Sequence, residues 1–339
     1  MRIFTVIMLM AGLCAGTLLV AHYGFAGVGA ALLAVGWTGF FAILAIHLGI
    51  VALCGLAWFA LVPRRQRPPA WVFIWARFVR DGASEVLPLS QVGGYVMGAR
   101  AATLVGLSGT LAFASTVVDI TMELVAQLAY TALGLGVFSV LRPEVEFTTP
   151  IAIGLAVVAV LAVGFIAAQQ RGFALLERLA NRIARQWAGN AATGAAAIQS
   201  AIHDIYSQRG GLLIGSMLHL LCWIVSAIEP WLALKFMGAP LGFGAVLAIE
   251  SLLYAARSVA FIVPNALGVQ EGAYILLGGL FGLDPDTALA ISLLKRARDL
   301  SLGVPALLAW QLVESGRIWR LRTAPAMAKR PDQARSSRK

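Results

Sequence analysis

The chain has 339 residues, of which 60% are apolar and only 12% are charged, and its formal net charge is +10. Because so few polar side chains cannot cover a water-exposed surface, this composition excludes a soluble enzyme or a soluble binding domain. Several apolar runs reach the roughly 20 residues of a transmembrane helix, and they are continuous rather than alternating, which disfavours membrane-spanning strands. The sequence therefore predicts an all-α, polytopic integral membrane protein.

Six apolar runs are predicted to cross the bilayer fully. The first follows Arg2 and resembles a signal peptide, but it is too long for a signal core, so we expect a retained helix. The six spans are expected near residues 3–22, 39–62, 106–140, 151–169, 211–236 and 287–312. Two further apolar stretches, residues 70–103 and 241–281, are interrupted by proline and glycine, and we predict broken or re-entrant hairpins there.

The positive charge lies in loops and tails rather than on one compact patch, so no nucleic-acid partner is predicted. The basic segments are Arg2, residues 64–100, residues 171–209 and the tail after Arg317. The positive-inside rule places these segments in the cytoplasm, and the opposite loops carry acids such as Glu144 and Asp284. With six crossings, both termini are expected in the cytoplasm.

The linker at residues 171–209 has apolar residues at helical spacing among its arginines. This pattern predicts a pair of amphipathic helices on the anionic lipids of the inner leaflet, with a solvated cytoplasmic hairpin as the alternative. Residues 316–339 are polar and basic, which is typical of a disordered tail. The predicted units are residues 1–38 with the first span and outer loop, 39–140 as repeat unit A, 141–210 with the fourth span and linker, 211–315 as repeat unit B, and the 316–339 tail.

The two broken hairpins predict an inverted repeat. Each hairpin is flanked by two full spans, and the span count makes the hairpins enter from opposite sides of the bilayer. Pro88 aligns with Pro264, and Gly106 with Gly282, at one common offset. Transporters built in this way bind their substrate near the midplane, between the repeats.

Several charged residues fall inside the predicted spans, where an ionisable side chain costs roughly 2.5–3.5 kcal/mol unless it finds a partner or an aqueous cavity. Asp119 and Glu123 are four residues apart and therefore lie on one helix face. We expect these acids to face basic residues of the last span across the repeat interface, as a gate, with a purely structural ion pair as the alternative. The predicted gate or ion-pair residues are Asp119, Glu123, Lys295, Arg296, Arg298 and Asp299.

The two breaks are the predicted substrate site. Proline and glycine leave backbone groups there without helical hydrogen bonds, and these groups must bond to something polar. A half-helix that begins at about Val269 would direct its positive N-terminus at a phosphate or carboxylate head group. The predicted substrate-binding residues are Glu85, Pro88, Arg100, Glu250, Tyr254, Arg257, Pro264, Asn265, Gly268, Gln270 and Glu271.

No cofactor or metal site is predicted. The four histidines show no ligand spacing, and the three cysteines lie in apolar runs, where a thiol behaves as a small hydrophobe. The sequence also has no phosphate loop, dinucleotide fingerprint or nucleophile elbow. We therefore do not expect an enzyme.

Several of these motifs together resemble one membrane-protein family. They are Leu87-Pro88 with Gly93-Gly94, then Arg100, Asp119 and Glu123, and then Arg257 ahead of Pro264 in Val-Pro-Asn-Ala-Leu-Gly-Val-Gln-Glu-Gly. The set resembles the flippase-like transmembrane region of lysylphosphatidylglycerol synthases over roughly residues 3–315, and is most similar to the branch of hopanoid-biosynthesis-associated membrane protein L. The resemblance implies a bacterial inner-membrane protein that moves or handles a hopanoid or an associated polar lipid.

We therefore expect a lipid translocase whose membrane lipid substrate passes between the two broken hairpins. Two alternatives remain, namely a scaffold that recruits lipid-modifying enzymes and a carrier of small solutes or ions. The partners left open by the sequence are a second copy of the chain and proteins of lipid biosynthesis.

Overall fold

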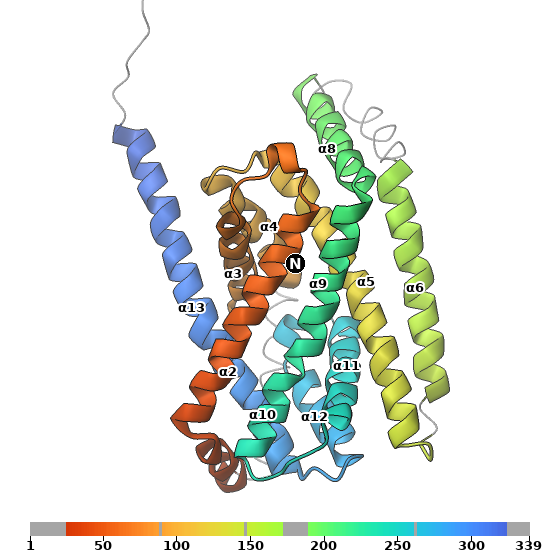
Figure 1. Cartoon of the computed structure of the whole chain (residues 1–339). Helices are drawn as coiled ribbons and strands as arrows, with labels where there is room; N and C mark the ends of the chain where they lie inside the picture. Colours follow the sequence, from red (N-terminus) through yellow and green to blue (C-terminus); the bar gives the residue numbers. More distant parts are fainter. Residues whose placement is uncertain (1–24, 88–89, 146–147, 172–188, 261–262, 324–339) are drawn as a thin grey trace, which may run out of the picture.

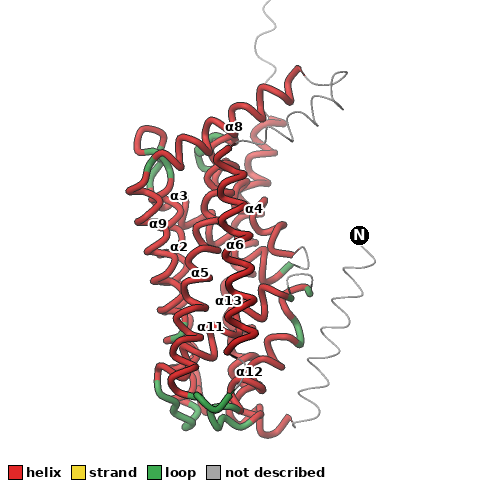
Figure 2. The backbone as a smooth tube through the Cα atoms, turned by 90° about the vertical axis from the view of Figure 1, so that its right-hand side faces the viewer, coloured by secondary structure: helices red, strands yellow, loops and turns green. Residues whose placement is uncertain are grey.

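The computed structural model of the chain describes residues 25–87, 90–145, 148–171, 189–260 and 263–323. This part is almost entirely helical and contains no strand, which confirms the predicted all-α class (Figures 1 and 2). Figure 2 shows that most helices run along one long axis, with turns gathered at its two ends. The predicted first span and most of the predicted tail lie outside the described residues.

The described helices follow the predicted order of elements. They are α2 (Phe25–Leu61), α3 (Ala70–Val86), α4 (Ser90–Leu104), α5 (Gly109–Leu141), α6 (Thr148–Arg171), α8 (Gly189–Ser207), α9 (Arg209–Ser226), α10 (Ile228–Phe236), α11 (Phe243–Val259), α12 (Val269–Gly279) and α13 (Pro285–Thr323). Two 3₁₀ turns, η1 (Arg64–Gln66) and η2 (Pro264–Ala266), lie between them.

Three of these helical segments are long and apolar enough to cross a bilayer: Gly29–Leu61, Gly109–Leu141 and Arg209–Phe236. The last of them combines α9 and α10. Helix α13 is long, but Lys295, Arg296, Arg298 and Asp299 interrupt its apolar sequence. These spans support a membrane protein, and the total of six crossings stays a prediction.

Both predicted breaks are present, since α3 with α4 and α11 with α12 form two helix pairs. Helix α3 ends at Leu87, whose extended backbone (φ −93°, ψ 140°) suits a residue that precedes a proline. After α11 the chain turns through Asn265 (φ 52°) and Gly268 (φ 80°), both left-handed, which stops a helix from continuing. Entry of the two pairs into the bilayer from opposite faces stays a prediction.

The two halves of the molecule are arranged in opposite directions. Helices α2 and α9 run antiparallel, and α3 with α4 lies towards one end of the bundle while α11 with α12 lies towards the other (Figure 1). Gly106 (φ 114°) and Gly282 (φ 81°) both adopt a positive φ just before α5 and α13. These positions agree with the offset found in the sequence, and the repeat itself stays a prediction.

The largest core cluster among the described residues joins α2, α3, α4, α5 and α8. Trp58 is completely buried, lies 5.5 Å from the Phe73 ring and donates to the Ser115 hydroxyl at 3.0 Å. Ile202 and Ile205 of α8 are buried in the same cluster. These two residues of α8 therefore pack on the protein, and contact of the linker with inner-leaflet lipids stays a prediction. The same amphipathic pattern suits a helix that packs on protein and a helix that lies on lipid. The first predicted helix of this linker, at residues 172–188, lies outside the described residues.

Helices α3 and α13 cross at a pair of glycines. A Cβ atom placed on Gly82 would lie 3.0 Å from both the Cα and the carbonyl oxygen of Gly303. We predict that Gly82→Leu lowers the free energy of unfolding by about 1–3 kcal/mol, because the helices must separate. Thermal unfolding of the purified protein in detergent measures this loss.

The matched control is Gly136→Leu on α5, where a new Cβ meets nothing within 4 Å. An equal loss of stability in both variants would show that glycine at the crossing has no special role.

Candidate functional site

The breaks of the two hairpins meet in a direct contact between α3 and α11. The guanidinium of Arg257 donates through Nη2 to both carboxylate oxygens of Glu85, at 3.1 and 3.2 Å. The side-chain amide of Asn265 donates to the backbone carbonyl of Glu85 at 2.8 Å. Carbonyl groups in the last turn of a helix have no intrahelical donor, and the Glu85 carbonyl lies in the last turn of α3. Asn265 of the second hairpin supplies the missing hydrogen bond.

The N-terminus of α12 binds a carboxylate of its own helix. Helix α12 begins at Val269, which confirms the predicted start, and Gly268 N donates to Glu271 Oε2 at 2.8 Å. Arg296 donates to Glu271 Oε1 at 2.7 Å and to Oε2 at 3.1 Å, a bidentate pair. The sequence predicted that this helix N-terminus binds the anionic group of a ligand. In the structure, the Glu271 carboxylate occupies that position.

These contacts connect into one cluster that we call the tip network. Arg257 Nη1 donates to Gln270 Oε1 at 2.9 Å, and Gln270 Nε2 donates to Ser292 Oγ at 2.8 Å. Ser292 Oγ in turn donates to Glu271 Oε1 at 3.0 Å. The tip network consists of Glu85, Arg257, Asn265, Gln270, Glu271, Ser292 and Arg296.

Exposure distinguishes the tip network from the other buried charges. The side chains of Glu85, Arg296 and Arg257 are 24%, 15% and 11% exposed. In contrast, Lys295 and Glu250 are 4% and 0% exposed. The tip network is therefore partly accessible from outside the protein, whereas the pair of Lys295 and Glu250 is enclosed.

Glu250 and Tyr254 belong mainly to a second cluster, in which Glu250 and Lys295 are buried. Lys295 Nζ donates to Glu250 Oε2 at 2.7 Å and to the Tyr274 hydroxyl at 3.0 Å, and that hydroxyl also donates to Glu250. The same ammonium lies 4.9 Å from the Tyr254 ring centroid. This cluster fastens α11, α12 and α13 together, and contact of Glu250 with a substrate stays a prediction.

The expected pairing of Asp119 and Glu123 with the last span is wrong. Arg80 donates to Asp119 Oδ2 at 2.6 Å and also to Glu123, and Arg77 donates to Glu123 Oε1 at 2.8 Å. His219 Nε2 lies 2.9 Å from Asp119 Oδ1. The acids pair with Arg77 and Arg80 of α3 and with His219 of α9, because the packing of these helices places the basic side chains next to them. The sequence feature that could have predicted this pairing was the presence of Arg77 and Arg80, three residues apart, within an apolar helix.

The remaining basic residues of α13 also have partners other than Asp119 and Glu123. Arg298 donates to Glu229 of α10, and to Asp299 Oδ1 at 2.6 Å. Glu229 Oε1 in addition lies 2.9 Å from His47 Nδ1 of α2. The predicted gate residues therefore form three separate groups, one around Asp119, one around Glu250 and one around Glu229, while Arg296 belongs to the tip network.

Three of the predicted site residues stand apart from the tip network or are only partly described. Arg100 pairs with Glu314 of α13 at 2.7 Å and is largely exposed. Pro88 lies outside the described residues, and Pro264 forms the turn η2 next to Asn265. In the described part of the chain, no three His, Cys, Asp or Glu side chains gather as metal ligands.

Comparison with known proteins gives one match. The sequence model of a family described as the lysylphosphatidylglycerol synthase TM region matches residues 3–308. No curated protein and no solved structure matches the chain significantly.

The pairing of α3 with α5 can be tested by removing one partner and then both. We predict that Arg80→Gln lowers the free energy of unfolding by about 3–5 kcal/mol, because Asp119 is left buried and charged. Adding Asp119→Asn should recover much of this loss, since the buried side chain that lost its closest cationic partner is then neutral. Thermal unfolding in detergent measures both steps. The pairing would be refuted by a double variant no more stable than Arg80→Gln alone.

Proposed function

The chain belongs to the lysylphosphatidylglycerol synthase TM-region family, and from this membership we propose that it moves a polar lipid between the leaflets, with the head group passing between the two broken hairpins. Family membership and the apolar helices already indicate a membrane protein with a lipid-related function. The finer proposal rests on one observation, the contact of the two hairpin breaks in the tip network.

The composition of the tip network suits a zwitterionic or anionic head group. Arg257 and Arg296 each present a planar guanidinium, which binds phosphate in a bidentate manner. Without lipid, Glu85 and Glu271 occupy these guanidiniums. An arriving phosphate replaces one of these carboxylates at its arginine. The head group therefore has a positively charged partner and never lies unpaired in the bilayer.

The contact between Glu85 and Arg257 acts as the closure between the hairpins. A head group can pass only if the two breaks separate, which breaks this ion pair and the bond from Asn265 to Glu85. Lipid that binds the separated arginine favours the open arrangement, in agreement with alternating access in transporters built from paired broken helices.

The proposed location is the inner membrane of a bacterium, with the basic end in the cytoplasm. Arg64, Arg65 and Arg67 lie in the turn after α2 at one end of the bundle, and Glu144 and Asp284 lie in turns at the other end (Figure 1). The positive-inside rule assigns the first end to the cytoplasm.

The proposed substrate is a hopanoid or an associated polar lipid, and the proposed action involves no covalent chemistry. The substrate class rests on the resemblance of the whole motif set, over roughly residues 3–315, to the hopanoid-associated branch of the family. Lipid-biosynthesis proteins of the same membrane are the partners that would supply such a substrate.

Reconstitution into vesicles tests the proposal. We predict that Arg257→Gln and Arg296→Gln each slow the movement of fluorescent polar lipid between leaflets by at least about tenfold, because one charge-assisted phosphate contact is lost. Reduction of the fluorescence of outer-leaflet lipid by an impermeant reagent gives the rate.

Arg100→Gln is the matched control, because it also removes an ion-paired arginine but lies away from the tip network. Each variant is checked for thermal unfolding, so that misfolding is separated from lost transport. The proposal fails if the folded wild-type protein moves no lipid, or if both tip-network variants move it at the wild-type rate.

A further inference from the structure

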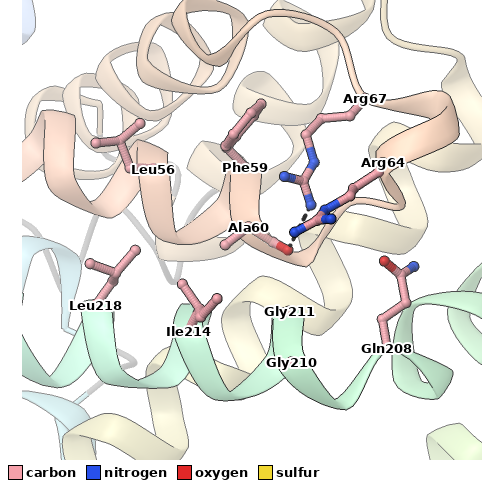
Figure 3. Close-up of a pocket in the computed structure, with 10 residues that line it drawn as sticks. All are labelled: Leu56, Phe59, Ala60, Arg64, Arg67, Gln208, Gly210, Gly211, Ile214 and Leu218. Atoms are coloured by element: carbon pink, nitrogen blue, oxygen red, sulfur yellow. Dashed lines mark hydrogen bonds between the residues drawn. The ribbon is translucent and has the colours of Figure 1, made fainter.

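A groove separate from the tip network lies between the end of α2 and the beginning of α9. It has a volume of about 540 Å³. Figure 3 shows Leu56 and Phe59 on one wall and Ile214 and Leu218 on the other, with two arginines at one end. We refer to this feature, lined by α2, η1 and α9, as the α2–α9 groove.

The α2–α9 groove begins where two candidate spans end and runs along them. The candidate spans end at Leu61 in α2 and begin at Arg209 in α9, so the polar end of the groove coincides with the ends of both spans. From Gly210 to Leu218 the groove follows α9 for about 12 Å, at 1.5 Å per residue. Ile214 is 54% exposed on this wall, which therefore offers apolar surface to a chain lying in the membrane.

Two arginines, Arg64 and Arg67, lie side by side at the polar end of the groove (Figure 3). Arg67 donates to the carbonyls of Val62 and Ala60, at 2.8 and 3.1 Å, and its guanidinium covers the Phe59 ring at 4.4 Å. Within the described residues, neither Arg64 nor Arg67 forms an ion pair with a carboxylate.

The closeness of the two positive charges is electrostatically unfavourable. Partial burial lowers the pKa of Arg67 from its ordinary value, and the positive charge of Arg64 lowers it further. An anion between the two guanidiniums would remove the repulsion between them. Because Arg67 is already fixed by the carbonyls at the end of α2, Arg64 is the arginine free to follow a ligand.

We propose that the α2–α9 groove binds one anionic phospholipid of the adjacent leaflet, with its phosphate at Arg64 and Arg67 and an acyl chain along Leu56, Ile214 and Leu218. Charge and apolarity both support this occupant, since a free anion would use only the arginines and a neutral lipid only the apolar wall. Such a lipid would hold the end of α2 against α9. The groove is separate from the tip network, so this inference does not depend on the proposed lipid movement.

The test is titration of the purified full chain with phosphatidylglycerol, phosphatidylcholine or glycerol 3-phosphate, with bound ligand counted by native mass spectrometry. We expect phosphatidylglycerol to bind more tightly than phosphatidylcholine. Arg64→Gln should weaken the binding of phosphatidylglycerol about fivefold, the effect of one arginine near an anionic lipid, and leave phosphatidylcholine unchanged.

Two further variants make the result specific. Arg65→Gln removes the neighbouring arginine, which does not line the groove, and should leave the affinity for phosphatidylglycerol unchanged. Gly210→Leu should weaken both lipids, because a Cβ at Gly210 meets nothing within 4 Å and the side chain can fill the groove without moving the backbone.

If Arg64→Gln and Arg65→Gln lowered the affinity for phosphatidylglycerol equally, general surface charge would explain the binding, and the proposal would be overturned. Displacement of phosphatidylglycerol by glycerol 3-phosphate at equal concentration would also overturn it, because the groove would then bind a free anion. Thermal unfolding of each variant confirms that the compared proteins are folded.

Discussion

A charge buried in an apolar helical bundle must have its partner within hydrogen-bonding reach, and this requirement organises the whole molecule. Asp119 lies completely buried and is held by Arg80 at 2.6 Å, while Glu250, equally buried, is held by Lys295 at 2.7 Å. An ion left without a partner in either place would cost several kcal/mol. Each half of the bundle is therefore fastened by its own internal ion pair, and the broken hairpins are held firmly against the long helix that follows them.

The contact between the two hairpins has a different character. Among the described residues, the ion pair of Glu85 with Arg257 is the one that joins α3 and α4 to α11 and α12, and both of its side chains are partly exposed. Water can replace a partner there at far lower cost than at Asp119 or Glu250. The ion pair at the hairpin breaks is thus opened more easily than the pairs at Asp119 and Glu250, as the proposed path between the hairpins requires.

The sequence predicted the helices and their breaks well, because proline and glycine act on the backbone locally. The extended conformation of Leu87 ahead of Pro88 and the start of α12 at Val269 are examples. The pairing of charges was not predictable in the same way, since Asp119 had several basic residues within plausible reach, and only packing in space selected Arg80. For the same reason, the apolar stripe of α8 gave no indication whether lipid or protein would cover it.

Separation of the hairpin breaks can be tested most directly by tying them together. In a protein whose native cysteines are replaced by alanine, Leu87→Cys and Asn265→Cys would be joined by a short reducible cross-linker and assayed for lipid movement in vesicles. The same protein serves as its own control before linking and after reduction. We expect the linked protein to move no lipid and the reduced protein to recover its full rate. Undiminished lipid movement in the linked protein would contradict a path between the hairpins.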